Sequence, residues 1–332
     1  MRARFLAALS LGLLFAAPLA AAEPENCALK TIAKLPMTTL PSGRVTVPLT
    51  VMQRPSNFLL DTAGAISQLN TYVIAELNLR VQAGGAQLTG VDGRRREGYV
   101  MVPSITLGGV EIPKQFFFAA RPIYKAPDGQ PTGGNTFDGL LAPSMLRNVD
   151  YDLNFTGKML TLFSDEHCAG KDIYWPAEVV AIVPFKVNRP DHITFDVELD
   201  GQQVEATLDT GASDATLDQD LARTKFGVDL AGDSVRKSGE LEGCPIYEKR
   251  FSTLTFEGIT VKNPVMRLLP NLIDQGEVTG TRIKRDRSDT LPRIIVGMSA
   301  LKKLHVYIAT EERKLYITPG AAQKAVPAEA PR

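Results

Sequence analysis

Apolar and polar residues alternate along two stretches that lie in separate halves of the chain. The apolar positions recur at every second residue, at Val45, Val47, Leu49 and Val51 in the first half and at Ile193, Phe195, Val197 and Leu199 in the second. A period of two is typical of a β-strand that buries one face. The pattern therefore predicts a half-buried strand in each half of the chain.

Each predicted strand is followed, after a short interval, by an aspartate at the end of an apolar run. The two aspartates, Asp61 and Asp209, are separated by 209 − 61 = 148 positions, and the same offset superposes the two strands, since 193 − 45 = 148. A carboxylate beside an apolar strand is costly unless it is hydrogen-bonded. The small residues that follow allow the backbone to turn and direct N–H groups at it. Both aspartates are therefore candidates for a tuned acid or base.

A second matched pair of segments lies near the end of each half. Residues 138–146 correspond to residues 293–301, an offset of 293 − 138 = 155, and both predict a buried strand that runs into a short helical turn. Each segment is followed by two further predicted strands, at 149–153 and 158–162 in the first half and at 304–308 and 313–317 in the second. These matches indicate an internal duplication over most of the chain.

The sequence Asp-Thr-Gly-Ala after apolar residues, followed later in the same half by two apolar residues and Gly, resembles the retropepsin/pepsin superfamily of aspartic proteases. Two copies in one chain resemble a two-lobed enzyme with retropepsin-like lobes of the bacterial type, and the resemblance covers roughly residues 43–318. It implies an all-β acid protease fold, with two pseudo-symmetric β-barrel lobes and a cleft between them. The lobes would span residues 23–170 and 181–320, joined by a linker at 171–180.

The resemblance also implies the chemistry. A pseudo-two-fold axis would bring Asp61 and Asp209 together, and two carboxyls that close share one proton. One would act as general base on a water while the other protonates the carbonyl of a peptide or protein substrate, without a metal or a cofactor. By resemblance, Thr62 and Thr210 hydrogen-bond across the lobe interface, although either could be an ordinary turn residue. The supporting loops are completed by Ala63, Gly64, Gly211 and Ala212.

Two alanines in the first half depart from the family pattern. Ala63 and Ala142 occupy positions where the family has glycine, and the second half has Gly297 at the position equivalent to Ala142. The added methyl groups are either tolerated or move Asp61 out of line. A catalytically impaired, protease-like protein that binds peptides is therefore the alternative to an active endopeptidase, and an all-β scaffolding protein of the envelope is a third possibility. Retention of both aspartates favours the enzyme, because an unused buried carboxyl pair is costly.

Residues 87–102 predict a hairpin with a polar, glycine-rich tip. By resemblance this hairpin occupies the place of the flap that closes over substrate, with Gly93, Gly98 and Tyr99 as candidate flap residues. The arginines at 94–96 would favour acidic substrates, or they form a solvated turn. The equivalent stretch of the second half lies near 238–247.

The start of the chain reads as a signal peptide over residues 1–22. A short basic start precedes an apolar stretch, Phe5–Leu19, that is too short to span a membrane, and small residues precede Glu23. We therefore expect an exported protein, periplasmic or extracellular. The Ala/Pro-rich residues 321–332 predict a disordered tail.

The overall composition excludes several other classes of protein. The formal net charge of zero gives no support to a nucleic-acid partner, and no later run is apolar enough to span a bilayer. The three histidines, at 167, 192 and 305, lack the spacing of metal ligands. The internal pseudo-two-fold axis predicts a monomer.

The chain contains three cysteines, Cys27, Cys168 and Cys244. In an exported protein at most one disulfide can form within such a chain. We expect Cys27 to pair with Cys168, which would tie the chain start to the junction of the lobes. The alternative is that all three are small buried residues.

Overall fold

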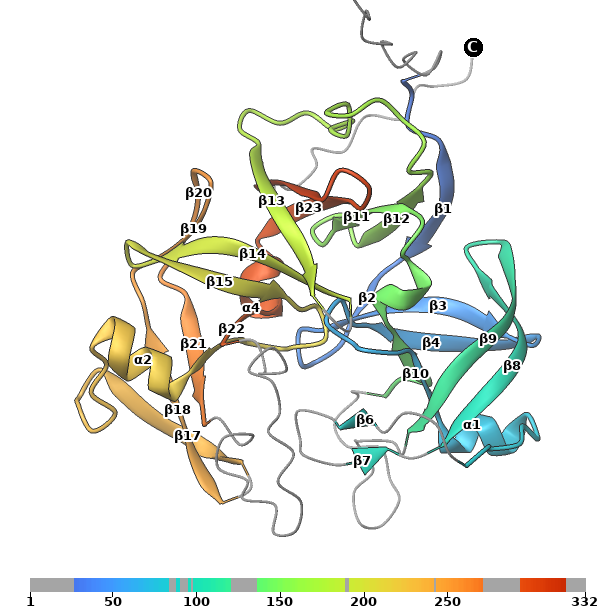
Figure 1. Cartoon of the computed structure of the whole chain (residues 1–332), viewed down its shortest axis with the longest axis horizontal. Coiled ribbons are helices and arrows are strands. Elements are labelled where there is room, and N and C mark those ends of the chain that lie inside the picture. The colour runs from blue at the N-terminus through green and yellow to red at the C-terminus, as the bar shows by residue number, and fades with distance from the viewer. Residues whose placement is uncertain are drawn as a thin grey trace, which may run out of the picture.

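The structure is a computed structural model, and it describes residues 27–83, 88–89, 95–96, 98–120, 136–188, 191–241, 243–270 and 293–320. The expected signal peptide (1–22), the expected tail (321–332) and Gly93 lie outside the described residues. Within them the chain is mostly β-sheet, as the sequence predicts (Figure 1). No helix in the described part of the chain is both long and apolar enough to cross a membrane.

The strands of the first half form one barrel and contribute to a second sheet. They are β1 (Thr31–Pro36), β2 (Thr38–Thr39), β3 (Val45–Val51), β4 (Arg54–Leu60), β5 (Gln68–Asn70), β6 (Leu88–Thr89), β7 (Arg95–Arg96), β8 (Tyr99–Leu107), β9 (Val110–Ala120), β10 (Gly139–Leu141), β11 (Asp150–Asn154) and β12 (Met159–Phe163). The helical turns are α1 (Thr71–Glu76) and the 3-10 turn Pro143–Met145. The sheet order is β2-β3-β4-β10-β5-β9-β8, and β3 also pairs with β8, which closes the barrel.

The second half repeats this arrangement. Its strands are β13 (Ala181–Asn188), β14 (His192–Leu199), β15 (Gln202–Leu208), β16 (Ala215–Asp218), β17 (Val235–Leu241), β18 (Cys244–Arg250), β19 (Thr253–Phe256), β20 (Ile259–Lys262), β21 (Val265–Leu269), β22 (Ile294–Val296), β23 (Leu304–Ala309) and β24 (Lys314–Pro319). Its helices are α2 (Gln219–Phe226) and α4 (Met298–Leu301). Asp218 caps α2 by accepting a hydrogen bond from Leu221 N, and Gly227 ends it in the left-handed conformation.

The two predicted alternating strands are β3 and β14, and their apolar positions are all buried, as the period of two predicts. The pairing around them is the same in both halves. In the first half β4 is parallel to β10, and β10 is antiparallel to β5. In the second half β15 is parallel to β22, and β22 is antiparallel to β16. The chain therefore folds as the two-lobed repeat that the duplication predicts.

Strands from both halves form a joint sheet in the order β1-β12-β11-β23-β24-β13, in which every neighbouring pair is antiparallel. The labelled members β1, β11, β12, β13 and β23 gather at the top of Figure 1, above the two lobes. At the centre of this sheet Asp152 of β11 lies opposite Tyr307 of β23. These residues are equivalent in the duplication, because 307 − 152 = 155. The pseudo-two-fold axis therefore passes between them.

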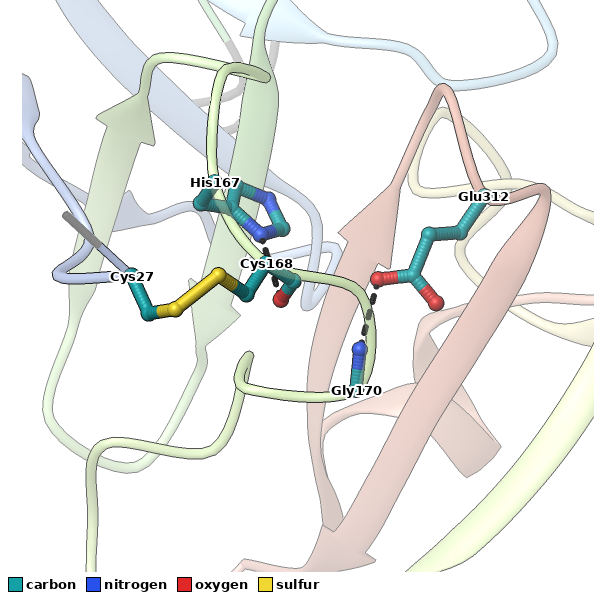
Figure 2. The surroundings of a disulfide bond; sticks show 5 residues. All are labelled: Cys27, His167, Cys168, Gly170 and Glu312. Carbon is teal, nitrogen blue, oxygen red and sulfur yellow. Dashed lines mark hydrogen bonds between the residues drawn. A yellow bond between two sulfur atoms is a disulfide. The ribbon is translucent and has the colours of Figure 1, made fainter. Parts of the chain in front are cut away.

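Residues 164–180, which we call the interlobe segment, connect β12 to β13 without forming a strand or a helix. A disulfide joins Cys168 of this segment to Cys27, as expected. Figure 2 shows this disulfide beside His167, and it shows Gly170 N donating to Glu312 Oε1 at 2.9 Å. Further along, the Trp175 ring stacks on the His305 ring with centroids 3.9 Å apart. The interlobe segment is thus fixed to the joint sheet along its length.

Candidate active site

Asp61 and Asp209 each lie at the end of a central strand of their lobe. Asp61 follows β4 and its N–H donates to Leu141 O at 3.0 Å, whereas Asp209 follows β15 and its N–H donates to Val296 O at 3.1 Å. The acceptors belong to β10 and β22, the strands of the second matched sequence motif. The parallel pairing of these strands therefore sets the position of each aspartate.

Two threonines join the loops that carry the aspartates. Thr62 N donates to Thr210 Oγ1 at 3.1 Å, and Thr210 N donates to Thr62 Oγ1 at 3.0 Å. The hydroxyls themselves donate to carbonyls across the interface, from Thr62 to Leu208 O at 3.0 Å and from Thr210 to Leu60 O at 2.7 Å. Both side chains are buried. These threonines are therefore interlocked across the lobe interface, and neither is an ordinary turn residue.

The interlock brings the carboxyl groups of Asp61 and Asp209 into hydrogen-bond contact with each other. Both residues remain partly exposed to solvent. Burial raises the pKa of both carboxyls, and the neighbouring Asp209 charge raises the pKa of Asp61 further. Two coupled carboxyls of this kind hold one proton between them over a wide pH range.

The backbone around the pair is not symmetric. Asp209 Oδ1 accepts two N–H groups, from Gly211 at 2.7 Å and from Ala212 at 3.2 Å, whereas Asp61 Oδ1 accepts one, from Ala63 at 3.1 Å. Hydrogen bonds to the charged form of a carboxyl favour ionisation. The shared proton therefore resides on Asp61, and Asp209 is the ionised partner.

Two glycines make the close approach possible. A Cβ on Gly211 would lie 2.5 Å from Asp61 Cγ, although Gly211 belongs to the other lobe. A Cβ on Gly64 would lie 2.9 Å from the Leu140 side chain and 3.1 Å from Asp61 Cγ. All three distances are shorter than ordinary contacts. A larger residue at position 211 or 64 would therefore push Asp61 away from Asp209.

The two alanines that depart from the family pattern are accommodated. Ala142 is fully buried and its N–H donates to Ser67 Oγ at 3.0 Å. In the other lobe a Cβ on Gly297 would lie 2.2 Å from Asp214 O, so that lobe requires glycine there. The methyl group of Ala142 does not break the hydrogen bonds of Asp61, and Asp61 keeps its place beside Asp209.

A second pair of residues lies around the dyad and was not predicted from the sequence. Arg44 and His192 are equivalent in the duplication, each preceding its aspartate by 17 positions, since 61 − 44 = 209 − 192 = 17. Arg44 is buried, and its charge favours ionisation of Asp61. His192 hydrogen-bonds to the Ala63 backbone and lies near Asp209, and burial lowers its pKa. The duplication could have revealed this pair, because the offset of 148 aligns Arg44 with His192.

The candidate flap is partly described. β6 and β7 pair Leu88 with Arg96 and Thr89 with Arg95, which confirms a hairpin at these residues. Gly98 has φ +100°, and the Tyr99 ring packs against Phe116 with centroids 5.7 Å apart. In the second half β17 and β18 form the hairpin expected near 238–247. The role of these hairpins over a substrate stays a prediction.

The chain matches the family model described as "Aspartyl protease" over residues 47–142 and again over 195–300. It therefore belongs to the aspartyl protease family and contains the family domain twice. Among solved structures it is similar to basic 7S globulin from soybean, with a TM-score of 0.50 and 11% identity over 89% of this chain and 96% of that one. It is also similar to conglutin gamma from lupine seeds, with a TM-score of 0.49 and 10% identity over 88% and 95% of the two chains. At this identity the soybean structure shows the shared fold alone, and no curated protein matches the sequence.

Proposed function

We propose that this protein is an exported, monomeric aspartic endopeptidase that hydrolyses peptide bonds with a water activated by Asp61 and Asp209. The observation that carries the proposal is the carboxyl pair, which the threonine interlock holds in contact and which has one proton to share. The substrate would be a peptide or a protein. The fold and the family are compatible with this activity, and the pair supplies the chemistry.

The asymmetry of the pair assigns a role to each carboxyl. Ionised Asp209 takes a proton from a water bound between the carboxyls as the water oxygen attacks the carbonyl carbon. Asp61 gives its proton to the carbonyl oxygen, which produces a tetrahedral intermediate with two hydroxyl groups. Collapse of the intermediate needs one proton for the departing amine nitrogen, and the now protonated Asp209 supplies it. Asp61 recovers its proton from the hydroxyl that becomes the new carboxyl group.

We expect a weakly acidic pH optimum. Gly64 and Ala212 stand where a hydroxyl would donate to each ionised aspartate, and each lost donor raises a carboxyl pKa. The Ser67 hydroxyl lies behind the loop, where its oxygen accepts the Ala142 N–H, and it is not among the groups that hydrogen-bond to Asp61. The singly ionised pair, which is the working form, should therefore persist to higher pH.

Export is part of the proposal because of the disulfide. Cys27 and Cys168 are bonded across 141 positions of sequence, and such bonds persist in oxidising compartments. Together with the expected signal peptide at 1–22, the disulfide supports a periplasmic or extracellular location. Detection of the protein in a periplasmic or secreted fraction, with its N-terminus at Glu23, would test this.

The activity is tested by digestion of casein and of a peptide library, with and without pepstatin. Asp61→Asn and Asp209→Asn should each lower the cleavage rate by roughly 100-fold or more, because Asn is neither acid nor base. Asp196→Asn, at an exposed position on β14, is the matched control and should cleave like the wild type. Wild-type activity in the Asp61 variant would exclude the shared mechanism.

The alanines at 63 and 142 favour one second candidate, a protease-like protein that binds peptides without cleaving them. The same experiment separates the two functions. A non-cleaving protein would leave casein intact while still binding pepstatin or members of the peptide library, and the aspartate variants would then change affinity alone.

A further inference from the structure

A second buried cluster of ionisable side chains lies far from the dyad in sequence, at the junction of the interlobe segment and the joint sheet. It consists of Asp150 from β11 together with His167 and Asp172 from the interlobe segment, and one ligand-type atom from each lies within 4.8 Å of the others. The side chains are 2%, 3% and 0% exposed, respectively. The proposed peptidase mechanism does not use them.

The carboxylate of Asp172 has no hydrogen-bond partner among the described residues, at either oxygen. The hydroxyl of Tyr316 lies near it, but that hydroxyl donates its single proton to Glu312 Oε2 at 2.9 Å. An unpaired buried carboxylate is among the costliest groups in a protein. Among the described residues the nearest basic atom, His167 Nε2, lies 3.6 Å from Asp172 Oδ1, beyond hydrogen-bond distance, so neither oxygen of this buried carboxyl is satisfied.

The other two members are oriented as metal ligands usually are. His167 Nε2 lies 2.7 Å from Asp150 Oδ2 and 3.6 Å from Asp172 Oδ1, so this nitrogen faces both carboxylates. The opposite nitrogen, Nδ1, lies 3.2 Å from Cys168 O. Asp150 Oδ1 is held by the N–H and the hydroxyl of Thr310, both at 2.8 Å. Such supporting hydrogen bonds fix the tautomer and the orientation of metal-bound side chains.

We propose that Asp150, His167 and Asp172 form a structural zinc site. Zinc takes nitrogen and carboxylate oxygen ligands at about 2.0–2.1 Å, which in a tetrahedron separates any two ligand atoms by roughly 3.4 Å. The separation of 3.6 Å between His167 and Asp172 already fits, and the 2.7 Å contact between His167 and Asp150 must widen by less than 1 Å. All three ligand atoms lie within 4.8 Å of one another, and Asp172 would bind through one of its unpartnered oxygens.

The site would add to the restraints on the interlobe segment. This segment contains 17 residues (164–180) without regular structure, and irregular loops of this length are uncommon in compact domains. The cluster ties this segment to β11 one residue away from the disulfide at Cys168. Through Thr310, which follows β23, it also connects to the second half of the chain.

The test uses the full chain after treatment with EDTA and gel filtration. With ZnCl₂ as the probe, calorimetry should give one zinc per chain, and zinc should raise Tm by about 5 °C. Asp172→Asn should abolish both effects without lowering the Tm of the zinc-free protein, because the carboxylate has no partner to lose. Glu166→Gln, at an exposed acid in the same segment, is the matched control and should bind like the wild type.

A wild-type protein that binds no zinc, or equal binding by Asp172→Asn, would overturn the proposal. None of these readouts depends on proteolysis.

Discussion

The threonine interlock should be the most sensitive point of the lobe interface. In Thr62→Val the side-chain shape is kept, but the hydroxyl no longer accepts from Thr210 N or donates to Leu208 O, each at 3.0 Å. Both partners then remain unpaired in a buried place, at a cost of roughly 1–3 kcal/mol each. The additional buried methyl returns about 1 kcal/mol. We expect a net loss of about 1–5 kcal/mol in the free energy of unfolding.

Thr207 provides a control with the same chemistry and the opposite sign. Its hydroxyl is buried and has no hydrogen-bond partner in the described part of the chain. Thr207→Val removes an unsatisfied polar group and should stabilise the protein by about 1 kcal/mol. Urea unfolding, followed by the fluorescence of Trp175, the single tryptophan, gives both midpoints. If Thr62→Val is no less stable than Thr207→Val, the interlock does not hold the lobes together.

Three further predictions concern the dyad. Gly211→Ala should lower the cleavage rate by at least tenfold without unfolding the protein, because the new Cβ would lie 2.5 Å from Asp61 Cγ; wild-type rates on a peptide substrate would contradict this. Asp61→Asn should gain stability relative to the wild type as the pH rises above about 4. The raised pKa of Asp61 makes the folded wild type the better proton binder, so its stability falls as the pH rises above the unfolded pKa. Urea midpoints at several pH values measure this, and a constant difference would exclude it. His192→Arg places a permanent charge near Asp209 and should move the pH–rate maximum to lower pH, and an unchanged profile would show that His192 does not tune the pair.

Much of the fold follows from the sequence because its determinants are local and repeated. The period of two at residues 45–51 and 193–199 needs only a buried face, and the structure has β3 and β14 there. The offset of 155 predicts the equivalence of the strands that meet in the joint sheet, where Asp152 pairs with Tyr307. An alternating strand alone predicts only local structure. Because the strand recurs at a fixed offset, the sequence also predicts two lobes related by a pseudo-two-fold axis.

The parts that sequence could not predict depend on contacts between distant segments that share no pattern. His192 reaches the Ala63 backbone of the other lobe, and nothing beside it in the sequence marks that contact. His167 and Asp172 lie in a stretch without hydrophobic periodicity. The polar residues of β11, which include Asp150, would be expected to face solvent from sequence alone, but they are buried in the structure. The spacing of the histidines therefore did not predict the cluster of Asp150, His167 and Asp172.

The loop of the second lobe shows why glycine is retained there. Met298 N donates to Ala212 O at 2.9 Å, and Ser299 N donates to Ser213 O at 3.0 Å. These hydrogen bonds hold the loop after Asp209 against the start of α4. The approach is so close that a Cβ on Gly297 would lie 3.0 Å from Ala212 O. Held in this way, the loop directs two N–H groups at its aspartate.

The first lobe carries Ala142 at the equivalent position, and its backbone N–H is bound by Ser67 Oγ instead. The methyl group occupies space that in the second lobe is taken by the loop after Asp209. The first-lobe loop directs one N–H, from Ala63, at Asp61. One fewer donor leaves Asp61 the weaker acid of the pair. The departures from glycine therefore leave the two carboxyls in contact, with Asp61 holding the shared proton. In the mechanism that we propose, the first lobe then supplies the acid and the second lobe the base.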